Sequence, residues 1–153
     1  MQFWKMHGLG NDYIVIDNRD NKINGKQAPN LAKRLCERQF SVGADGLLLV
    51  SNSQVADAKM RIFNADGSEA EMCGNGIRCF AKYCYENGIV VQPEFMVETI
   101  SGLKHVWLTL YGKEVTAVKV DMGSPNWERE SLPMIGQGTC IEENLDVDGE
   151  IFK

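Results

Sequence analysis

The chain has 153 residues, of which 44% are hydrophobic and 24% charged, a balance typical of one folded domain with a buried core. Its net charge of -5 and the lack of a basic stripe argue against nucleic-acid binding, which depends on clustered Lys and Arg. The longest apolar run, residues 47–50, is too short to cross a bilayer, and residues 1–5 do not begin a signal peptide. We therefore expect a cytoplasmic protein with neither nucleic acid nor membrane as a partner.

The first pattern along the chain is Gly8-Leu9-Gly10, which contains Gly-x-Gly. A dinucleotide-binding loop would need a third glycine and would follow a strand, whereas this pattern precedes one. We therefore predict a tight turn here.

Short strands dominate the expected secondary structure. Six segments are β-branched, aromatic or alternating in polarity, which is typical of strands. They are residues 13–16, 46–50, 58–63, 95–99, 103–110 and 115–120.

Two helices are expected among these strands. The first begins near Pro29, which the first turn tolerates, and its predicted buried face carries Leu31, Leu35 and Cys36. The second follows Cys73. Its apolar residues recur at helical spacing. They are Ile77, Phe80, Ala81 and Cys84, and Asn87-Gly88 supplies the stop.

Together these elements predict an α+β fold in which a curved, mixed or mostly antiparallel sheet wraps a central helix. After Asp121 the pattern is interrupted by repeated Gly and Pro. Residues 145–151 then alternate in polarity as a strand does, and the sequence ends two residues later, at Lys153. We therefore expect the end of the chain to hold an unfinished strand.

The five cysteines are an odd number, which fits free thiols better than a disulfide framework. Cys73, Cys79 and Cys84 lie close together in the sequence but form no CxxC pair, and His7 and His105 are remote. We therefore expect no metal.

Cys73 is the strongest candidate for a reactive group. It lies in a Gly-rich turn directly before the second helix, where the helix dipole and the free N–H groups stabilise a thiolate. The same N–H groups can hold a carboxylate. The negative charges of Glu69 and Glu71 would oppose the effect on the thiol. A buried, inert thiol is the alternative, and it suits Cys79 and Cys84 better, so we expect Cys73 to face a cleft.

Two asparagines lie at the ends of predicted strands, Asn11 before the first and Asn64 after the third. A side-chain amide offers donors and an acceptor, which suits the head group of an amino acid. Asp45 is interpreted first as a turn residue before the next strand.

Three motifs, in this order and spacing, resemble the amino-terminal half of the diaminopimelate epimerase family. They are KMHGLGNDY at residues 5–13, FNADGSE at 63–69 and CGNGIRC at 73–79, and the similarity continues through VDMGSP at 120–125. The resemblance implies one half of a two-lobed fold. Residues 1–117 would form the amino-terminal half that carries Cys73, and residues 118–153 the truncated opening segment of the second half.

The resemblance also implies an activity, the interconversion of LL- and meso-diaminopimelate in lysine and peptidoglycan precursor biosynthesis, without a cofactor. Inversion of a stereocentre needs a base on one face and an acid on the other. By resemblance Cys73 is one of two catalytic cysteines and Asn11 and Asn64 bind substrate. Backbone N–H groups of Gly74 and Asn75 would receive the α-carboxylate as an oxyanion hole does.

The second cysteine of the family belongs to its carboxyl-terminal half, and no helix follows Cys140 that would let it serve instead. We therefore expect the 153-residue chain alone to be inactive. A missing lobe would leave apolar surface exposed, which favours self-association or a homodimer. Some relatives carry a substrate-contacting Gln where this chain has Gly46, so no role is transferred to that position.

Three alternatives remain at this point. A proline or hydroxyproline racemase would share the chemistry of two thiols. Other isomerases of the same architecture use a carboxylate at the position of Cys73, and the cysteine argues against them. A non-catalytic assembly module that carries a thiol is the third.

Overall fold

One curled sheet frames the first of the two units into which the chain divides. The computed structural model describes residues 1–132 and 134–152, and the first unit is Met1–Met122. The strands of the sheet are β1 (Trp4–Gly8), β2 (Asn11–Asp17), β3 (Gly46–Ser51), β4 (Ala58–Asn64), β5 (Glu69–Ala70), β6 (Glu94–Thr99), β7 (Gly102–Tyr111) and β8 (Glu114–Val120). All six predicted strands are among them.

The order along the sheet is β1-β2-β3-β4-β6-β7-β8, with β5 paired to β4. β2 with β3 and β4 with β6 run parallel, and the other neighbours are antiparallel. The predicted mixed sheet is therefore confirmed.

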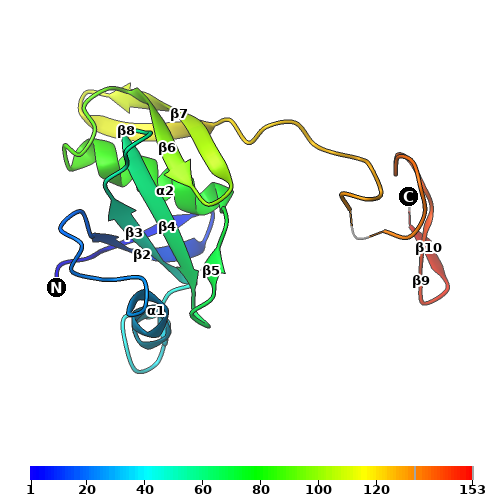
Figure 1. Ribbon diagram of the computed structural model, residues 1–153, viewed down its shortest axis with the longest axis horizontal. Coiled ribbons are helices and arrows are strands. Elements are labelled where there is room, and N and C mark those ends of the chain that lie inside the picture. The colour runs from blue at the N-terminus through cyan, green and yellow to red at the C-terminus, as the bar shows by residue number, and fades with distance from the viewer. Residues whose placement is uncertain (133, 153) are drawn as a thin grey trace. The chain divides into compact units, whose positions relative to one another are not determined.

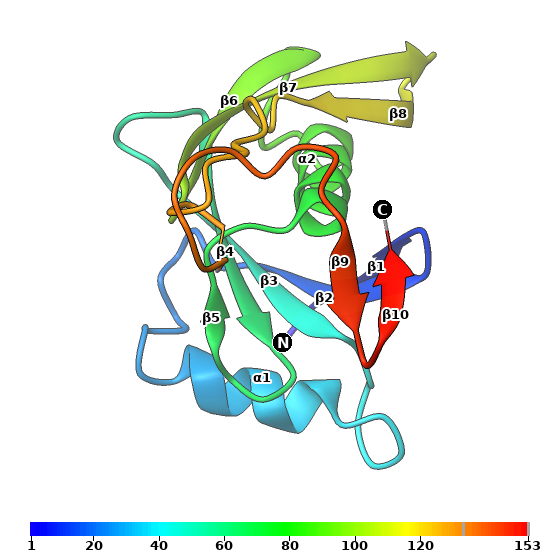
Figure 2. The same ribbon diagram turned by 90° about the vertical axis from the view of Figure 1, so that its right-hand side faces the viewer.

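The helix α2 (Gly74–Glu86) lies inside the curl of the sheet, as Figures 1 and 2 show. It contacts both outer strands, β1 and β8, as well as strands between them. Its four predicted core residues, Ile77, Phe80, Ala81 and Cys84, are fully buried. The predicted sheet around a central helix is thus confirmed, because the helical spacing of these residues gives α2 one continuous apolar face.

The sheet is covered on its other face by α1 (Ala28–Cys36). Alternate residues of a strand point to opposite faces, so Tyr13 and Val15 pack with α2 whereas Ile14 and Ile16 pack with α1. Residues 47–50 of β3 are buried on both sides for the same reason, which explains their continuous apolar run.

The buried face of α1 differs from the predicted one. The helix starts where Pro29 suggested, but its buried residues are Ala28, Ala32 and Cys36, whereas Leu31 and Leu35 are only partly buried. The buried three recur every four residues and are small, so the helix packs its backbone close to the sheet. The two leucines flank that stripe.

β1 was not predicted as a strand. It forms an antiparallel hairpin with β2, and its Trp4 and Met6 pack partly buried against the cluster around α2. The ring of Trp4 meets Tyr83 edge to face at 4.9 Å. Leu9 and Gly10 have φ angles of 54° and 87°, the pattern of a two-residue hairpin turn, so the predicted tight turn is confirmed.

The second unit begins at Gly123. The expected boundary at 117/118 lies inside β8, which is continuous from Glu114 to Val120. In place of the single unfinished strand, the structure has an antiparallel hairpin of β9 (Leu145–Val147) and β10 (Glu150–Phe152). Asp148 and Gly149 turn the chain with φ angles of 55° and 85°. Neither α1 nor α2, the helices of the described residues, is long and apolar enough to cross a membrane.

Candidate active site

Cys73 is the N-cap residue of α2, as its place in the sequence predicted. Its backbone is extended, with φ -144° and ψ 121°, and its Sγ accepts a hydrogen bond from the N–H of Gly76 at 3.4 Å. Its carbonyl oxygen accepts from the N–H of Ile77 at 2.9 Å. The first turn of a helix leaves the N–H groups of Gly74 and Asn75 without a partner inside the helix. A half-buried thiol therefore lies beside backbone donors.

Tyr13 joins Cys73 to Asn11. The Tyr13 hydroxyl donates to Asn11 Oδ1 at 2.9 Å and lies 2.9 Å from Sγ of Cys73. Sγ is 3.7 Å from the same Asn11 oxygen. Sequence reasoning missed Tyr13, although it lies two residues after Asn11 on one strand and therefore shares its face.

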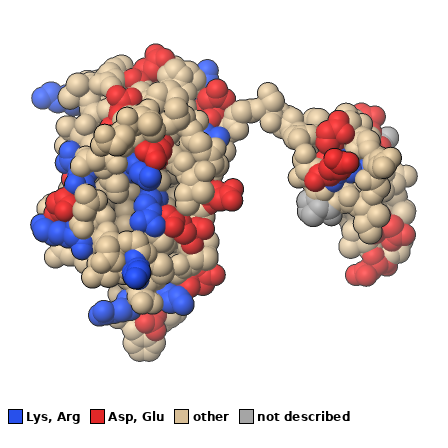
Figure 3. Space-filling view, viewed as in Figure 1, with Lys and Arg blue, Asp and Glu red and all other residues tan. Residues whose placement is uncertain are grey.

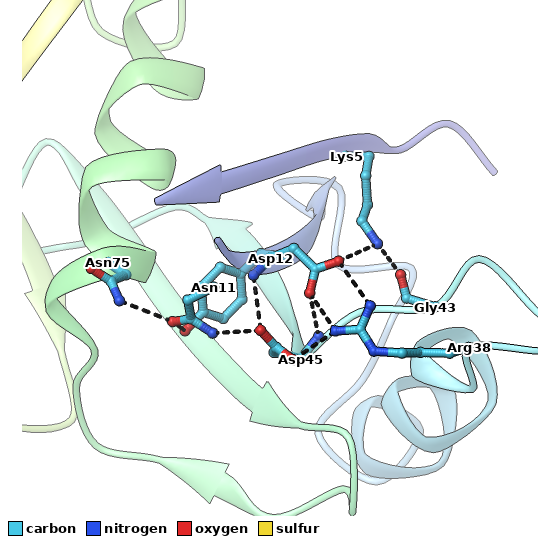
Figure 4. Close-up of polar contacts among 8 residues, drawn as sticks. Lys5, Asn11, Asp12, Arg38, Gly43, Asp45 and Asn75 are labelled. Atoms are coloured by element: carbon cyan, nitrogen blue, oxygen red, sulfur yellow. Dashed lines mark hydrogen bonds and ion pairs between the residues drawn. The ribbon is translucent and has the colours of Figure 1, made fainter. Parts of the chain in front are cut away.

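Asn75 contacts the same amide oxygen (Figure 4). Its Nδ2 donates to Asn11 Oδ1 at 3.3 Å, and its own Oδ1 accepts from Arg78 at 2.5 Å. A Cβ built on Gly8 would lie 3.3 Å from Cβ of Asn75, so the end of β1 is in close contact with the start of α2. The structure thus brings four of the predicted site residues together, namely Cys73, Gly74, Asn75 and Asn11.

The amide nitrogen of Asn11 contacts a charged cluster, which consists of Lys5, Asp12, Arg38 and Asp45. Asn11 Nδ2 donates to Asp45 Oδ2 at 2.8 Å. Arg38 pairs with both Asp12 and Asp45 at 2.7 Å, and Lys5 pairs with Asp12 at 2.8 Å (Figure 4). Asp45, interpreted as a turn residue from sequence, therefore fixes which way the Asn11 amide points.

The two carboxyl groups of this cluster are held ionised. A hydrogen bond from Arg38 keeps the pKa of Asp12 below its usual range, and a hydrogen bond from Asn11 lowers the pKa of Asp45. A carboxylate can only accept, so Asp45 binds the amide nitrogen and leaves the Asn11 oxygen toward Tyr13 and Cys73.

Asn64 lies at the end of β4, apart from these contacts. Its amide donates to Ser68 Oγ at 2.9 Å, and its side chain is exposed. The N–H of the next residue, Ala65, donates to the carbonyl oxygen of Asp45 at 3.2 Å. Within the described part of the chain, Asn64 shares no hydrogen bond with Asn11 or Cys73.

The negative charge expected near Cys73 is partly neutralised, because Glu69 forms an ion pair with Arg61 at 2.6 Å. On the face of the first unit drawn in Figure 3, Lys and Arg side chains are interspersed with Asp and Glu. No group of three His, Cys, Asp or Glu side chains converges among the described residues.

Three other cysteines fit the inert alternative. Cys36, Cys79 and Cys84 are buried, and burial raises the pKa of each thiol above its ordinary value. Cys140 is half-exposed and belongs to no helix. Cys73 is therefore the one thiol at a helix entrance among the described residues.

None of three cavities in the first unit is the cleft expected at Cys73. Three cavities of this unit, of about 860, 470 and 210 Å³, are all lined by other residues. The largest includes Tyr83 and Asn87, at the opposite end of α2 from Cys73. Within Met1–Met122, Cys73 is half-buried at the surface and lines none of these three cavities.

We expect Arg38→Gln to make the fold less resistant to acid. The ionised form of Asp12 stabilises the fold above its unfolded pKa of about 3.9, and that stability is lost as pH falls through the lower folded pKa. Without Arg38 the folded pKa rises, so unfolding begins at higher pH. Near-ultraviolet circular dichroism during acid titration measures the midpoint.

The matched control is Arg34→Gln, because Arg34 is exposed and makes no ion pair with a described residue. An Arg38→Gln midpoint equal to that of the control would contradict the role of Arg38.

Comparison with solved structures defines the class of fold. Methylitaconate-delta-isomerase superposes with a TM-score of 0.61 at 12% identity, over 74% of this chain and 35% of that one. A probable proline racemase from Agrobacterium radiobacter K84 gives a TM-score of 0.60 at 20% identity, over 77% and 40% of the two chains. The curled sheet around a central helix is therefore the fold of one part of these racemases and isomerases.

Sequence comparison then gives the family. The family model of diaminopimelate epimerase matches residues 3–128, and the chain belongs to this family. The diaminopimelate epimerases of Moorella thermoacetica and Desulfitobacterium hafniense are 51% and 50% identical to it over its whole length. The chain spans 55% of the length of each. The resemblance inferred from the three motifs is confirmed.

Proposed function

We propose that the natural full-length protein interconverts LL- and meso-diaminopimelate by proton transfer at the α-carbon, with Cys73 as one of the two acid–base groups. The observation that carries this proposal is the position of Cys73, at the N-cap of α2 and in contact with Asn11 and Tyr13. The names of two relatives that are 51% and 50% identical over the length of this chain support the choice of substrate.

The chemistry follows from what surrounds the sulfur. The α-proton of an amino acid leaves only if the negative charge that develops on the α-carbon and its carboxylate is stabilised. The N–H groups of Gly74 and Asn75, at the positive end of α2, are suited to receive that carboxylate. Sγ of Cys73 would then give a proton to one face of the carbon, or take it from that face in the reverse reaction.

Asn11 has one donor left for a substrate. Its oxygen already accepts from Tyr13 and Asn75, and one of its two amide hydrogens goes to Asp45. The second hydrogen is the group we propose for substrate binding. Asn64 would bind a more distant part of the same substrate from the end of β4, since Ala65 ties that strand end to Asp45.

A second acid–base group must approach the opposite face of the carbon. Cys36, Cys79 and Cys84 are unsuitable, because burial raises the pKa of each. We propose that the group comes from the part of the family's length that this chain does not span.

The five free cysteines also favour a reducing, cytoplasmic setting.

The test is an assay of the natural full-length protein with LL-diaminopimelate, in which chiral chromatography follows the meso isomer. We expect turnover by this protein and none by the 153-residue chain alone. L-Proline serves as the rival substrate, because a racemase of that type would invert it instead. Inversion of proline without inversion of diaminopimelate would overturn the proposal, and turnover by the 153-residue chain would overturn the need for a second group outside it.

A further inference from the structure

The hydroxyl of Tyr13 lies between two hydrogen-bond partners. It is 2.9 Å from Asn11 Oδ1 and 2.9 Å from Sγ of Cys73. Only 5% of Tyr13 is exposed, so water competes little for this hydroxyl. A phenolic hydroxyl has one proton, and it can therefore donate to only one of these two partners at a time.

The ring of Tyr13 is fixed by close neighbours. Tyr13 pairs with Gly46 across β2 and β3, and a Cβ at Gly46 would lie 3.1 Å from Cε1 of the ring. A Cβ at Gly76, in the first turn of α2, would lie 3.4 Å from Cζ. Because glycines on both sides leave room for the ring and no more, the hydroxyl is held beside the sulfur.

The arrangement suits a cysteine that alternates between two protonation states. When Cys73 is a thiol, Tyr13 donates to Asn11 and its oxygen can accept the S–H. When Cys73 is a thiolate, its negative charge would be repelled by the lone pairs of the Tyr13 oxygen if the hydroxyl proton pointed elsewhere. The hydroxyl must therefore turn and donate its hydrogen bond to sulfur. Asn75 remains as a donor to Asn11 at 3.3 Å, so the amide oxygen is not left without a partner.

We propose that Tyr13 is a positioning residue that follows the protonation state of Cys73, accepting a hydrogen bond from the thiol and donating one to the thiolate. It keeps its own proton throughout, and the proton that reaches or leaves the substrate is that of Cys73. The inference deepens the proposed function and rests on it for its purpose, but the hydrogen bonds themselves do not depend on the substrate.

The state of Tyr13 supports this role. Burial, together with the hydrogen bond to Cys73, raises the pKa of Tyr13 above its ordinary value. The hydroxyl is therefore protonated at neutral pH and available as a donor. Hydrogen bonds to a charged acceptor are stronger than those to a neutral one, so Tyr13 stabilises the thiolate more than the thiol.

The test is the pH profile of alkylation of Cys73 by iodoacetamide in the 153-residue chain, followed by mass spectrometry of the peptide that contains Cys73. We expect Tyr13→Phe to move the midpoint of the profile upward by about one pH unit, which is about tenfold slower alkylation below the midpoint. An unchanged or lowered midpoint in a folded Tyr13→Phe protein would overturn the proposal.

The matched control is Tyr83→Phe. Tyr83 is 2% exposed and belongs to the same apolar cluster, but it lies at the other end of α2. The Tyr83→Phe substitution should leave the midpoint of the alkylation profile unchanged. A shift equal to that of Tyr13→Phe would show that loss of any buried hydroxyl suffices, and would overturn the proposal.

A fluorinated tyrosine at position 13 keeps the test decisive if Tyr13→Phe fails to fold. Its hydroxyl is a stronger donor, so we expect the midpoint to move downward, and no downward shift would overturn the proposal. The alkylation profile needs no epimerase activity. If the alkylation midpoint shifts but the full-length protein does not epimerise diaminopimelate, the role of Tyr13 stands and the proposed function is overturned. If the full-length protein epimerises diaminopimelate but the midpoint does not shift, the proposed function stands and the role of Tyr13 is overturned.

Discussion

Cys73→Ala in the natural full-length protein is expected to lower kcat for epimerisation of diaminopimelate by about a thousandfold. A positioned acid or base contributes on the order of 10²–10⁴ in rate, and among the described residues no other thiol lies at the entrance of α2 to replace this one. KM should change little, because the proposed substrate donors at Asn11, Gly74 and Asn75 remain. Initial rates over a range of substrate concentrations separate the two quantities.

Cys140→Ala is the matched control for this experiment. Cys140 is also half-exposed, but no helix begins beside it, and we expect its removal to leave kcat within about twofold. A Cys73→Ala protein that keeps more than a tenth of the parent rate would contradict the catalytic role of Cys73.

Phe80→Ala is expected to cause the largest loss of stability of any change considered. Phe80 is fully buried in the cluster between α2 and the sheet. Truncating a buried Phe removes its apolar contacts and leaves a cavity, which costs about 3–5 kcal/mol. Urea unfolding, monitored by circular dichroism, measures this loss in the free energy of unfolding.

Tyr85→Ala provides the comparison for Phe80→Ala. Tyr85 is an aromatic residue on the same helix, but it is partly exposed, so we expect a loss of less than about 2 kcal/mol. Equal losses for the two changes would contradict the placement of Phe80 at the core and of Tyr85 at its margin.

The parts of the fold that follow from local pattern could be predicted. The apolar residues of α2 recur at helical spacing, and the residues of β3 form an unbroken apolar run, so both elements and their burial follow from the sequence. The position of Cys73 follows too, because the Gly-rich turn before an apolar helix marks the helix entrance.

The parts that depend on packing could not be predicted. β1 is short and has no β-branched residue, so its only signal is the alternation of Trp4 and Met6 with polar neighbours. In α1 the sequence offers both leucines and alanines for the buried face, and only the close approach of the helix to the sheet selects the alanines.

The polar network of the site was missed for a different reason. Asp45 reaches Asn11 across 34 positions of sequence, and Tyr13 reaches Cys73 across 60. Such contacts are created by the register of β2 against β3 and by the placement of α2, which no local pattern records. The shared face of Asn11 and Tyr13 was the one usable signal, and it indicates only that the two residues are neighbours.

Solvent hydrogen exchange tests the role of Cys73 most directly. In deuterium oxide, the natural full-length protein should place deuterium on the α-carbon of diaminopimelate as it inverts this carbon, because the proton that we propose Cys73 delivers would first equilibrate with solvent. Mass spectrometry of the product measures the incorporation. We predict deuterium in the inverted product and its loss in Cys73→Ala; inversion without deuterium, or incorporation by Cys73→Ala at the parent rate, would contradict proton transfer by this sulfur.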